Sequence, residues 1–278
     1  MKRATTAAAA VKNKLIKKKN SKTETAAKAV NGDVTSGDSV SPNTKQLSRE
    51  FYSKPCVELS RALLGKVLVR QLPHGEIIKG TIVETEAYPG TNVDEASASY
   101  NGKVTDKNRA MFMDPGTAYV YMTYGMYHCF NISSEGEGAA CLLRAIEPLE
   151  EYETMQTFRQ KSRKKSSAAA SKKFPFHELT NGPSKLCMAF DVRRENCDKM
   201  DLATSSEMWL EDSDDCRFNR KENVEIVAAK RIGIDRAPVK ARDKLFRFYI
   251  KDNMFVSTVK PSEIVRAAQA GSEDESNE

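Results

Sequence analysis

Hydrophobic and polar positions alternate over several short segments of the chain, which is the pattern of β-strands. Lys66–Leu72 and Glu76–Ala87 are two such segments, and the turn Pro73-His74-Gly75 between them predicts a β-hairpin. The polar stretch Pro89–Asn108 predicts a long loop. Five more strands are predicted, at Ala118–Tyr124, Tyr127–Ser133, Ala139–Ile146, Val224–Ile234 and Leu245–Ile250.

Helical signals lie before, between and after these strands. One helix is expected to begin near Ser53, as its N-cap, and to stop at Gly65. A second is expected across Glu150–Gln160, whose apolar residues have helical spacing, and a third after Asn181-Gly182-Pro183. Hairpins with helices between them imply the α+β class, as a single domain with a curved antiparallel sheet and surrounding helices, flanked by disordered tails.

Composition limits the class of protein further. The chain has 278 residues, of which 40% are hydrophobic and 29% charged, so it can build a packed core. No run approaches the roughly 18 apolar residues of a membrane span, and we expect no membrane partner. The six cysteines are widely spaced, and we interpret them as reduced thiols of an intracellular protein instead of a disulfide framework or a zinc site.

The net charge of +6 is concentrated at one end of the chain. Residues 1–49 contain eleven Lys or Arg and three acids, and their low apolar content predicts a disordered basic arm. Within it, the segment Lys12–Lys22 fits a nuclear import signal or a non-specific nucleic-acid contact, and equally a solubilising tail, with a mitochondrial transit peptide as a third interpretation. We also expect a mobile basic loop at 161–173 and an acidic disordered tail at 263–278.

Two carboxylates and a phenol share one face of the second strand of the first hairpin. Glu84, Glu86 and Tyr88 are spaced two residues apart, and side chains at this spacing point to the same side of a strand. A face with two acids at a strand end is expected to lie outside the hydrophobic core. The plainer interpretation is a solvated strand face without chemistry.

Four tyrosines crowd the next predicted hairpin, namely Tyr119, Tyr121, Tyr124 and Tyr127. Tyrosines in strands are most often half-buried packing residues. Around a glycine turn, here Gly125, they can also form a stacking surface for bases or a wedge for a duplex. The residues by themselves leave both interpretations open.

Ten blocks of sequence, in order, resemble the alkyladenine (3-methyladenine) DNA glycosylase family. The blocks are Arg61-Ala62-Leu63-Leu64-Gly65, Val83-Glu84-Thr85-Glu86-Ala87-Tyr88, Asn108-Arg109-Ala110-Met111-Phe112, Pro115-Gly116-Thr117, Tyr119-Val120-Tyr121, Tyr124-Gly125-Met126, Asn131-Ile132, Gly136-Glu137-Gly138-Ala139, Leu143-Arg144-Ala145 and Asn181-Gly182-Pro183-Ser184-Lys185-Leu186. The resemblance covers about 50–260 and implies a DNA glycosylase domain over residues 50–262. Ten ordered blocks make chance similarity improbable.

The resemblance implies an enzyme that flips alkylated or deaminated purines out of duplex DNA and hydrolyses the N-glycosidic bond in base-excision repair. Tyr124 matches the residue that the family inserts into the minor groove, and Met126 is expected to intercalate beside it. Tyr88 and Tyr121 match the rings that line the two faces of the extruded base. Because many alkylated purines are cationic, these phenol faces are expected to add cation–π attraction.

The same resemblance implies the roles of the polar residues. Glu86 matches the general base that deprotonates water, and Arg144 matches the residue that positions this water. Asn131 matches a pocket residue that excludes normal guanine, although a strand-end hydrogen bond would also explain it. Lys107 and Arg109 stand in a turn that is expected to contact the DNA backbone.

One pocket position departs from the family. Where the family has a histidine, this chain has Ala98, in the segment Asp94-Glu95-Ala96-Ser97-Ala98-Ser99. A ring that covers part of the base is thereby lost, while the backbone N–H is kept. Since stacking on an aromatic ring contributes about 1–3 kcal/mol, we expect slower or differently selective excision.

These observations favour a monofunctional DNA glycosylase that needs no metal or cofactor, because water is the nucleophile. Its expected partner is double-stranded DNA with damaged purines, its expected state a monomer, and its expected location the nucleus, with mitochondrial targeting as the alternative. A second hypothesis is a catalytically weakened damage-binding protein, because Ala98 replaces the pocket histidine. A third is an RNA-binding protein that uses the tyrosine hairpin and the basic arm.

Overall fold

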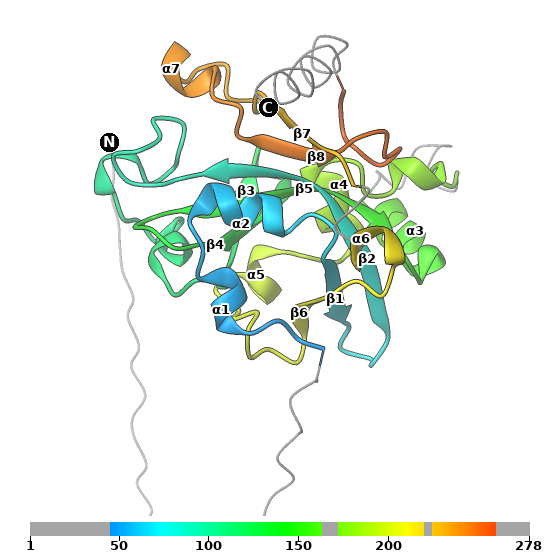
Figure 1. Cartoon of the computed structure of the whole chain (residues 1–278). Coiled ribbons are helices and arrows are strands. Elements are labelled where there is room, and N and C mark those ends of the chain that lie inside the picture. Colours follow the sequence, from blue (N-terminus) through cyan, green and yellow to red (C-terminus); the bar gives the residue numbers. More distant parts are fainter. Residues whose placement is uncertain (1–44, 163–171, 220–223, 260–278) are drawn as a thin grey trace, which may run out of the picture. The chain divides into compact units, whose positions relative to one another are not determined.

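The computed structural model describes residues 45–162, 172–219 and 224–259 (Figure 1). All of them belong to one compact unit. The arm up to residue 44, residues 163–171 of the basic loop expected at 161–173, and the acidic tail expected at 263–278 lie outside the described residues. The predictions for these three segments therefore stay predictions.

A long strand organises the sheet. β2 (Ile77–Tyr88) pairs with β1 (Val67–Gln71) along its first half and with β5 (Ala140–Pro148) on its other side. Its second half also pairs with β8 (Arg247–Ile250). The end of β2 thus lies between two strands that come from distant parts of the sequence (Figure 1).

The remaining strands extend the sheet at both edges. Its order is β3-β4-β5-β2-β1-β6, where β3 is Ala118–Thr123, β4 is Tyr127–Ser133 and β6 is Met208–Glu211. β7 (Ile226–Ala229) pairs with β8. All of these pairs are antiparallel, which confirms the predicted α+β fold built on an antiparallel sheet.

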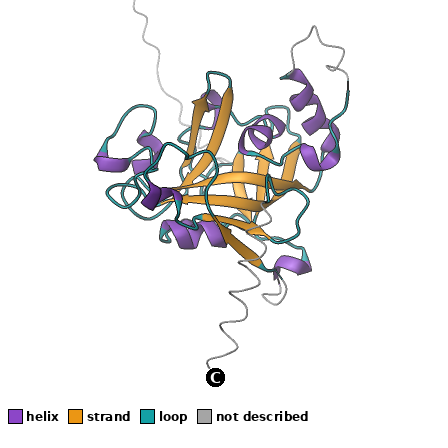
Figure 2. Ribbon diagram, turned by 90° about the horizontal axis from the view of Figure 1, so that it is seen from above, coloured by secondary structure: helices purple, strands orange, loops and turns teal. Residues whose placement is uncertain are grey.

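Short helices surround the sheet (Figure 2). They are α1 (Arg49–Tyr52), α2 (Cys56–Ala62), α3 (Tyr152–Lys161), α4 (Pro183–Ala189), α5 (Arg194–Cys197), α6 (Cys216–Asn219) and α7 (Val239–Arg242). The three predicted helices correspond to α2, α3 and α4. The cap of α2 is Pro55 and not the expected Ser53, which instead bonds through its hydroxyl to the carbonyl of Arg49.

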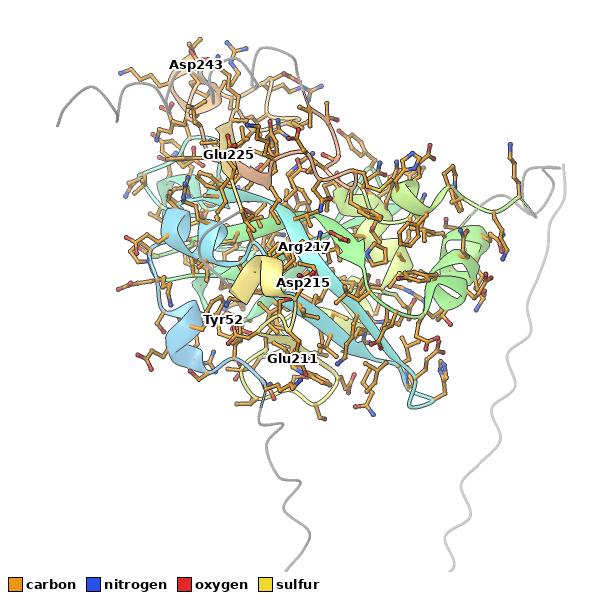
Figure 3. All side chains as sticks on the ribbon, turned by 45° about the vertical axis from the view of Figure 1, so that its right-hand side comes forward. Tyr52, Glu211, Asp215, Arg217, Glu225 and Asp243 are labelled. Atoms are coloured by element: carbon orange, nitrogen blue, oxygen red, sulfur yellow. The ribbon has the colours of Figure 1, made fainter. Side chains whose placement is uncertain are left out.

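The core lies between the sheet and the helices. Leu59 and Leu63, on and just after α2, are fully buried and belong to one apolar cluster with Ile82 of β2 and Ile146 of β5. Tyr52, at the end of α1, is also fully buried (Figure 3). These contacts fix α1 and α2 to the sheet.

Close packing explains one glycine. Gly116 has φ +91°, and a Cβ there would lie 2.8 Å from the ring of Tyr52. Any other residue would therefore combine a strained backbone with a clash. The turn before β3 is held in place by this contact.

Two boundaries differ from those predicted. Residues 45–49, which we assigned to the arm, belong to the fold, because Leu47 packs against the core and Arg49 begins α1. The strand predicted at Val224–Ile234 ends at Ala229, and a loop with Gly233 at φ +78° follows. β6 was not predicted, and it lies at the sheet edge beside β1. No helix in the described ranges has the length and apolar character needed to cross a membrane.

Candidate active site

An open cleft of about 530 Å³ lies beside the β3–β4 hairpin. Its walls come from this hairpin, from the loop between β2 and β3, and from the loop after β7. Its lining residues include Tyr88, Ala98, Lys103, Lys107, Asn108, Tyr119, Tyr121, Tyr124, Asn131, Arg144 and Ile232. Residues far apart in the sequence thus meet at one cleft, as the predicted site requires.

Aromatic rings form part of the wall. Tyr88 and Tyr121 both line the cleft, and Tyr121 stacks on Tyr119 with ring centroids 5.2 Å apart. Asn131 Nδ2 donates a hydrogen bond of 3.0 Å to the carbonyl of Tyr119. Asn131 is therefore both a lining residue and an anchored strand residue, so the two interpretations of this residue are compatible.

Glu86 lies beneath this wall, without exposed surface. Its Oε1 accepts a hydrogen bond of 2.7 Å from the backbone N–H of Ile232 and lies 3.2 Å from Arg144 Nη1. Its Oε2 accepts a bond of 2.9 Å from the hydroxyl of Tyr88. All three partners line the cleft. The carboxylate is therefore held directly behind the lining by the residues that form it.

Burial changes the acidity of this group. Desolvation raises the pKa of the Glu86 carboxyl, although the charge of Arg144 acts in the opposite direction. Burial and the negative charge of Glu86 also hold the pKa of the Tyr88 hydroxyl well above its ordinary value. Tyr88 is therefore a hydrogen-bond donor to Glu86 at neutral pH, and Glu86 is more basic than an exposed glutamate.

Glu84 orients the arginine of the site. Its Oε1 accepts bonds from Arg144 Nε at 3.0 Å and from Arg247 Nη1 at 2.9 Å, and its Oε2 accepts one from the Ser257 N–H at 2.7 Å. The expectation that Glu84 and Glu86 lie outside the core is wrong, since both are fully buried. The reason is that arginines on the flanking strands β5 and β8 neutralise them.

The tip of the β3–β4 hairpin presents an exposed ring. Tyr124 has φ +52° and is 87% exposed, and Gly125 follows with φ +68°. A bulky residue at positive φ is unusual and costs free energy, which is typical of a functional turn. Met126, also exposed, does not line the cleft but a groove on another side of the hairpin.

Of the two basic residues in the turn at 107–109, one lines the cleft and the other does not. Lys107 lines the cleft, whereas Arg109 is exposed, does not line it, and pairs with Asp106 at 3.5 Å. Ala98 lines the cleft as well, and its carbonyl accepts a bond of 3.0 Å from Asn108 Nδ2. The position where the family has a histidine therefore faces the cleft.

An ion pair that sequence reasoning missed supports the Tyr88 wall. Arg231 and Asp94 are both buried and paired, with Arg231 Nη2 2.8 Å from Asp94 Oδ1, and the Arg231 guanidinium carbon lies 4.7 Å from the Tyr88 ring centroid. Arg231 falls inside the segment interpreted as a strand. Gly233 was the signal in the sequence that the strand ends before this position and that a loop, which contains Arg231, follows it.

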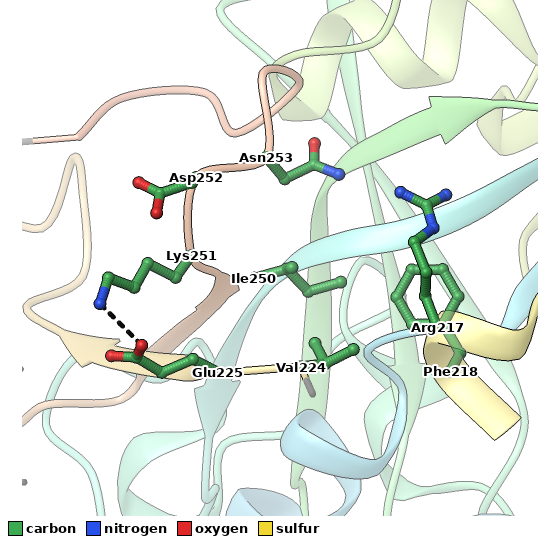
Figure 4. A pocket seen from close by; sticks show the side chains of 8 residues that line it. All are labelled: Arg217, Phe218, Val224, Glu225, Ile250, Lys251, Asp252 and Asn253. Atoms are coloured by element: carbon green, nitrogen blue, oxygen red, sulfur yellow. Dashed lines mark hydrogen bonds and ion pairs between the residues drawn. The ribbon is translucent and has the colours of Figure 1, made fainter. Parts of the chain in front are cut away.

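A different cavity, of about 350 Å³, lies beside β7 and β8 (Figure 4). Its carboxylates, Glu225 and Asp252, are exposed, and Lys251 Nζ lies 2.7 Å from Glu225 Oε2. These are ordinary surface charges, in contrast to the buried Glu86. Among the described residues, no cluster of three or more His, Cys, Asp or Glu could hold a metal ion, and five cysteines are free and buried.

A base taken out of a duplex needs faces to stack on, and a ring must fill the space that it leaves. Tyr88 and Tyr121 offer such faces, and Tyr124 is exposed at the rim. Together with a buried carboxylate behind the wall, this defines the class of base-flipping DNA glycosylases.

The chain belongs to the methylpurine-DNA glycosylase family, whose model matches residues 50–254. A DNA-3-methyladenine glycosylase from Homo sapiens is 48% identical over 214 residues, which are 77% of this chain and 68% of the relative. The corresponding protein from Mus musculus is 46% identical, over 77% of this chain and 62% of the relative. A putative 3-methyladenine DNA glycosylase from Clostridium perfringens (strain SM101 / Type A) is 46% identical, over 76% of this chain and 98% of the relative.

Proposed function

We propose that this DNA glycosylase uses the cleft to receive a damaged purine and Glu86 to activate the water that releases it. The observation that carries the proposal is the placement of Glu86, buried and bonded to three cleft residues, Tyr88, Arg144 and Ile232. A carboxylate in this environment is a stronger base than an exposed one.

The reaction is a hydrolysis. The water oxygen forms a bond to the anomeric carbon of the deoxyribose as the N-glycosidic bond breaks, and the bonding electron pair leaves with the base. Glu86 accepts the proton of the water, and its charge stabilises the positive charge that develops on the sugar. A neutral purine takes up one proton from solvent at the nitrogen that leaves, and Glu86 returns to solvent the proton that it accepted, so that the products are a free base and an abasic site. Water is the only co-reactant that this step consumes.

The surrounding residues divide the other tasks. Tyr124 would enter the minor groove and fill the vacated space, with Met126 beside it. Arg144, fixed by Glu84 and adjacent to Glu86, would position the water. Asn131, anchored by its bond to Tyr119, would exclude purines with an extra exocyclic amine.

Release of free base from defined duplexes tests this function. Duplexes with one hypoxanthine or one ethenoadenine should lose the damaged base under single-turnover conditions, while the undamaged duplex should not. Treatment with borohydride should trap no covalent enzyme–DNA product, because water and not an amine is the nucleophile. Absence of release from both damaged duplexes would refute the proposal.

Three further properties belong to the proposal. We expect a monomer, Arg109 in contact with the DNA backbone, and a nuclear location that depends on Lys12–Lys22. Sedimentation of the full chain tests the first. Fluorescence of a tagged chain with and without Lys12–Lys22 tests the location, and a mitochondrial signal would contradict it.

A further inference from the structure

Two of the tyrosine rings that line the cleft, those of Tyr88 and Tyr121, each lie near a cation. The Arg231 guanidinium carbon is 4.7 Å from the centroid of Tyr88, and Lys107 Nζ is 5.5 Å from the centroid of Tyr121. Arg231 is neutralised by its buried pair with Asp94. In the part of the chain that the structure describes, no ion pair joins Lys107 to a carboxylate. Its charge is therefore not balanced locally.

The backbone that carries Lys107 is fixed. The neighbouring Asn108 is buried, and its Nδ2 donates to the carbonyls of Ala98 at 3.0 Å and Lys103 at 2.9 Å. Its Oδ1 accepts from the N–H of Thr105 at 2.7 Å. These bonds tie the loop to the turn that contains Ala98. Lys107 is thus held at the cleft wall, next to the position where a small side chain leaves room.

The other charges of the cleft do not offset that of Lys107. Its described lining includes Lys103, Lys107 and Arg144, and no Asp or Glu. Arg144 is paired with Glu84 and Glu86, both buried behind the wall. The two lysines therefore make the mouth of the cleft positive.

We infer that Lys107 is a specificity residue that favours neutral damaged purines over purines with a fixed positive charge on the ring. The inference rests on the proposed function and names its substrate class. Deaminated and etheno-bridged purines are neutral, whereas purines alkylated at N3 or N7 carry a formal positive charge in DNA. Lys107 repels that charge, and it already occupies the cation–π position on Tyr121.

This inference reverses one expectation from the sequence. The tyrosine rings were expected to attract cationic bases, but the protein's own ammonium group, on Lys107, already lies 5.5 Å from the centroid of the Tyr121 ring. A cationic base must displace Lys107 or approach it closely. A neutral base loses nothing electrostatically when it stacks beside an ammonium group.

The test compares two lesions in one duplex sequence, 3-methyladenine as the cation and hypoxanthine as the neutral base, neither of which has the 2-amino group that Asn131 would exclude. For wild type and variants, the single-turnover rates and the dissociation constants are measured for both duplexes. Lys107→Met keeps the length of the side chain and removes its charge, and since Lys107 is exposed, the fold should be unaffected. Lys107→Arg restores the charge. Lys103→Met removes a cleft charge that lies over neither ring.

We expect Lys107→Met to raise the preference for 3-methyladenine relative to hypoxanthine by about tenfold. Lys107→Arg should keep the wild-type ratio, and Lys103→Met should change it by less than about twofold. If Lys107→Met weakens binding of both duplexes equally, and the slope of log affinity against log salt concentration falls by about one, Lys107 contacts a phosphate. That result would overturn the inference. A change in the lesion ratio for Lys103→Met as large as that for Lys107→Met would also overturn the inference.

The two proposals fail separately. If wild type releases neither base, the glycosylase assignment fails, while the ratio of dissociation constants for the two duplexes still reports the charge preference. If wild type releases hypoxanthine while Lys107→Met leaves unchanged both the ratio of rates and the ratio of dissociation constants for the two lesions, the charge preference fails and the glycosylase assignment stands.

Discussion

Replacement of Glu84 by glutamine should lower the stability of the fold and the pKa of Glu86, although it leaves Glu86, the proposed general base, in place. The Glu84 carboxylate is fully buried and accepts hydrogen bonds from two arginines, Arg144 and Arg247, and from Ser257. Glutamine keeps the shape but removes the charge, so two buried guanidinium groups lose a shared partner. Breaking a buried ion pair from one side costs about 3–5 kcal/mol.

The Glu84→Gln substitution should change both the Tm and the pH dependence of the excision rate. For a domain of this size, about 3 kcal/mol corresponds to a fall in Tm of roughly 6–12 °C. The negative charge of Glu84 also contributes to the raised pKa of Glu86. Its removal should therefore lower the pKa of Glu86, and the acid limb of the pH–rate profile should move to lower pH.

Calorimetry and single-turnover excision from pH 4.5 to 8 measure both effects. Glu211→Gln is the matched control, because Glu211, which is labelled in Figure 3, is a buried carboxylate at the end of β6 and does not line the cleft. It accepts a hydrogen bond from Trp209 of β6 and pairs with Lys79 of β2. The control substitution should lower Tm without moving the pH profile. An unchanged Tm for Glu84→Gln, or a shift of the acid limb to higher pH, would refute the reasoning.

Three further predictions concern Asn108, the exposed ring of Tyr124 and the pKa of Glu86. Asn108→Ala removes the side-chain bonds to Ala98 and Lys103 and should lower the free energy of unfolding by about 2–3 kcal/mol, measured by urea denaturation. Tyr124→Ala should leave Tm unchanged, because the side chain is exposed, yet weaken lesion binding in a fluorescence titration; equal binding would contradict its role. Because burial raises the pKa of Glu86 and its ionised form is the base, the wild-type rate should fall as pH drops through a pKa above 4.5, measured in single-turnover assays. A flat profile down to pH 4.5 would contradict this.

The local alternation of apolar and polar residues was enough to predict most of the strands. Alternation predicted β1 to β5 because each strand is flanked by a turn that contains glycine or proline. It failed at β6, a strand of four residues, Met208–Glu211, within polar surroundings. It also extended β7 beyond Ala229, because the apolar residues around Gly233 belong to a loop that packs on the site.

The burial of the carboxylates could not be predicted in the same way. Alternation placed Glu84 and Glu86 on one face, but their neutralisation depends on Arg144 and Arg247, which lie about 60 and 160 residues further along the chain. The family resemblance named Glu86 and Arg144, yet it gave no role to Glu84. Partners that pair across a sheet are decided by strand order, which a single sequence does not contain.

The central claim is that Glu86 activates the water that cleaves the glycosidic bond. Glu86→Gln tests it most directly, with hypoxanthine release measured under single turnover and binding to the same duplex measured separately. The account predicts a fall in rate of at least about 10²-fold with affinity unchanged within about threefold. A variant that binds normally and keeps the wild-type rate within about threefold would contradict the account.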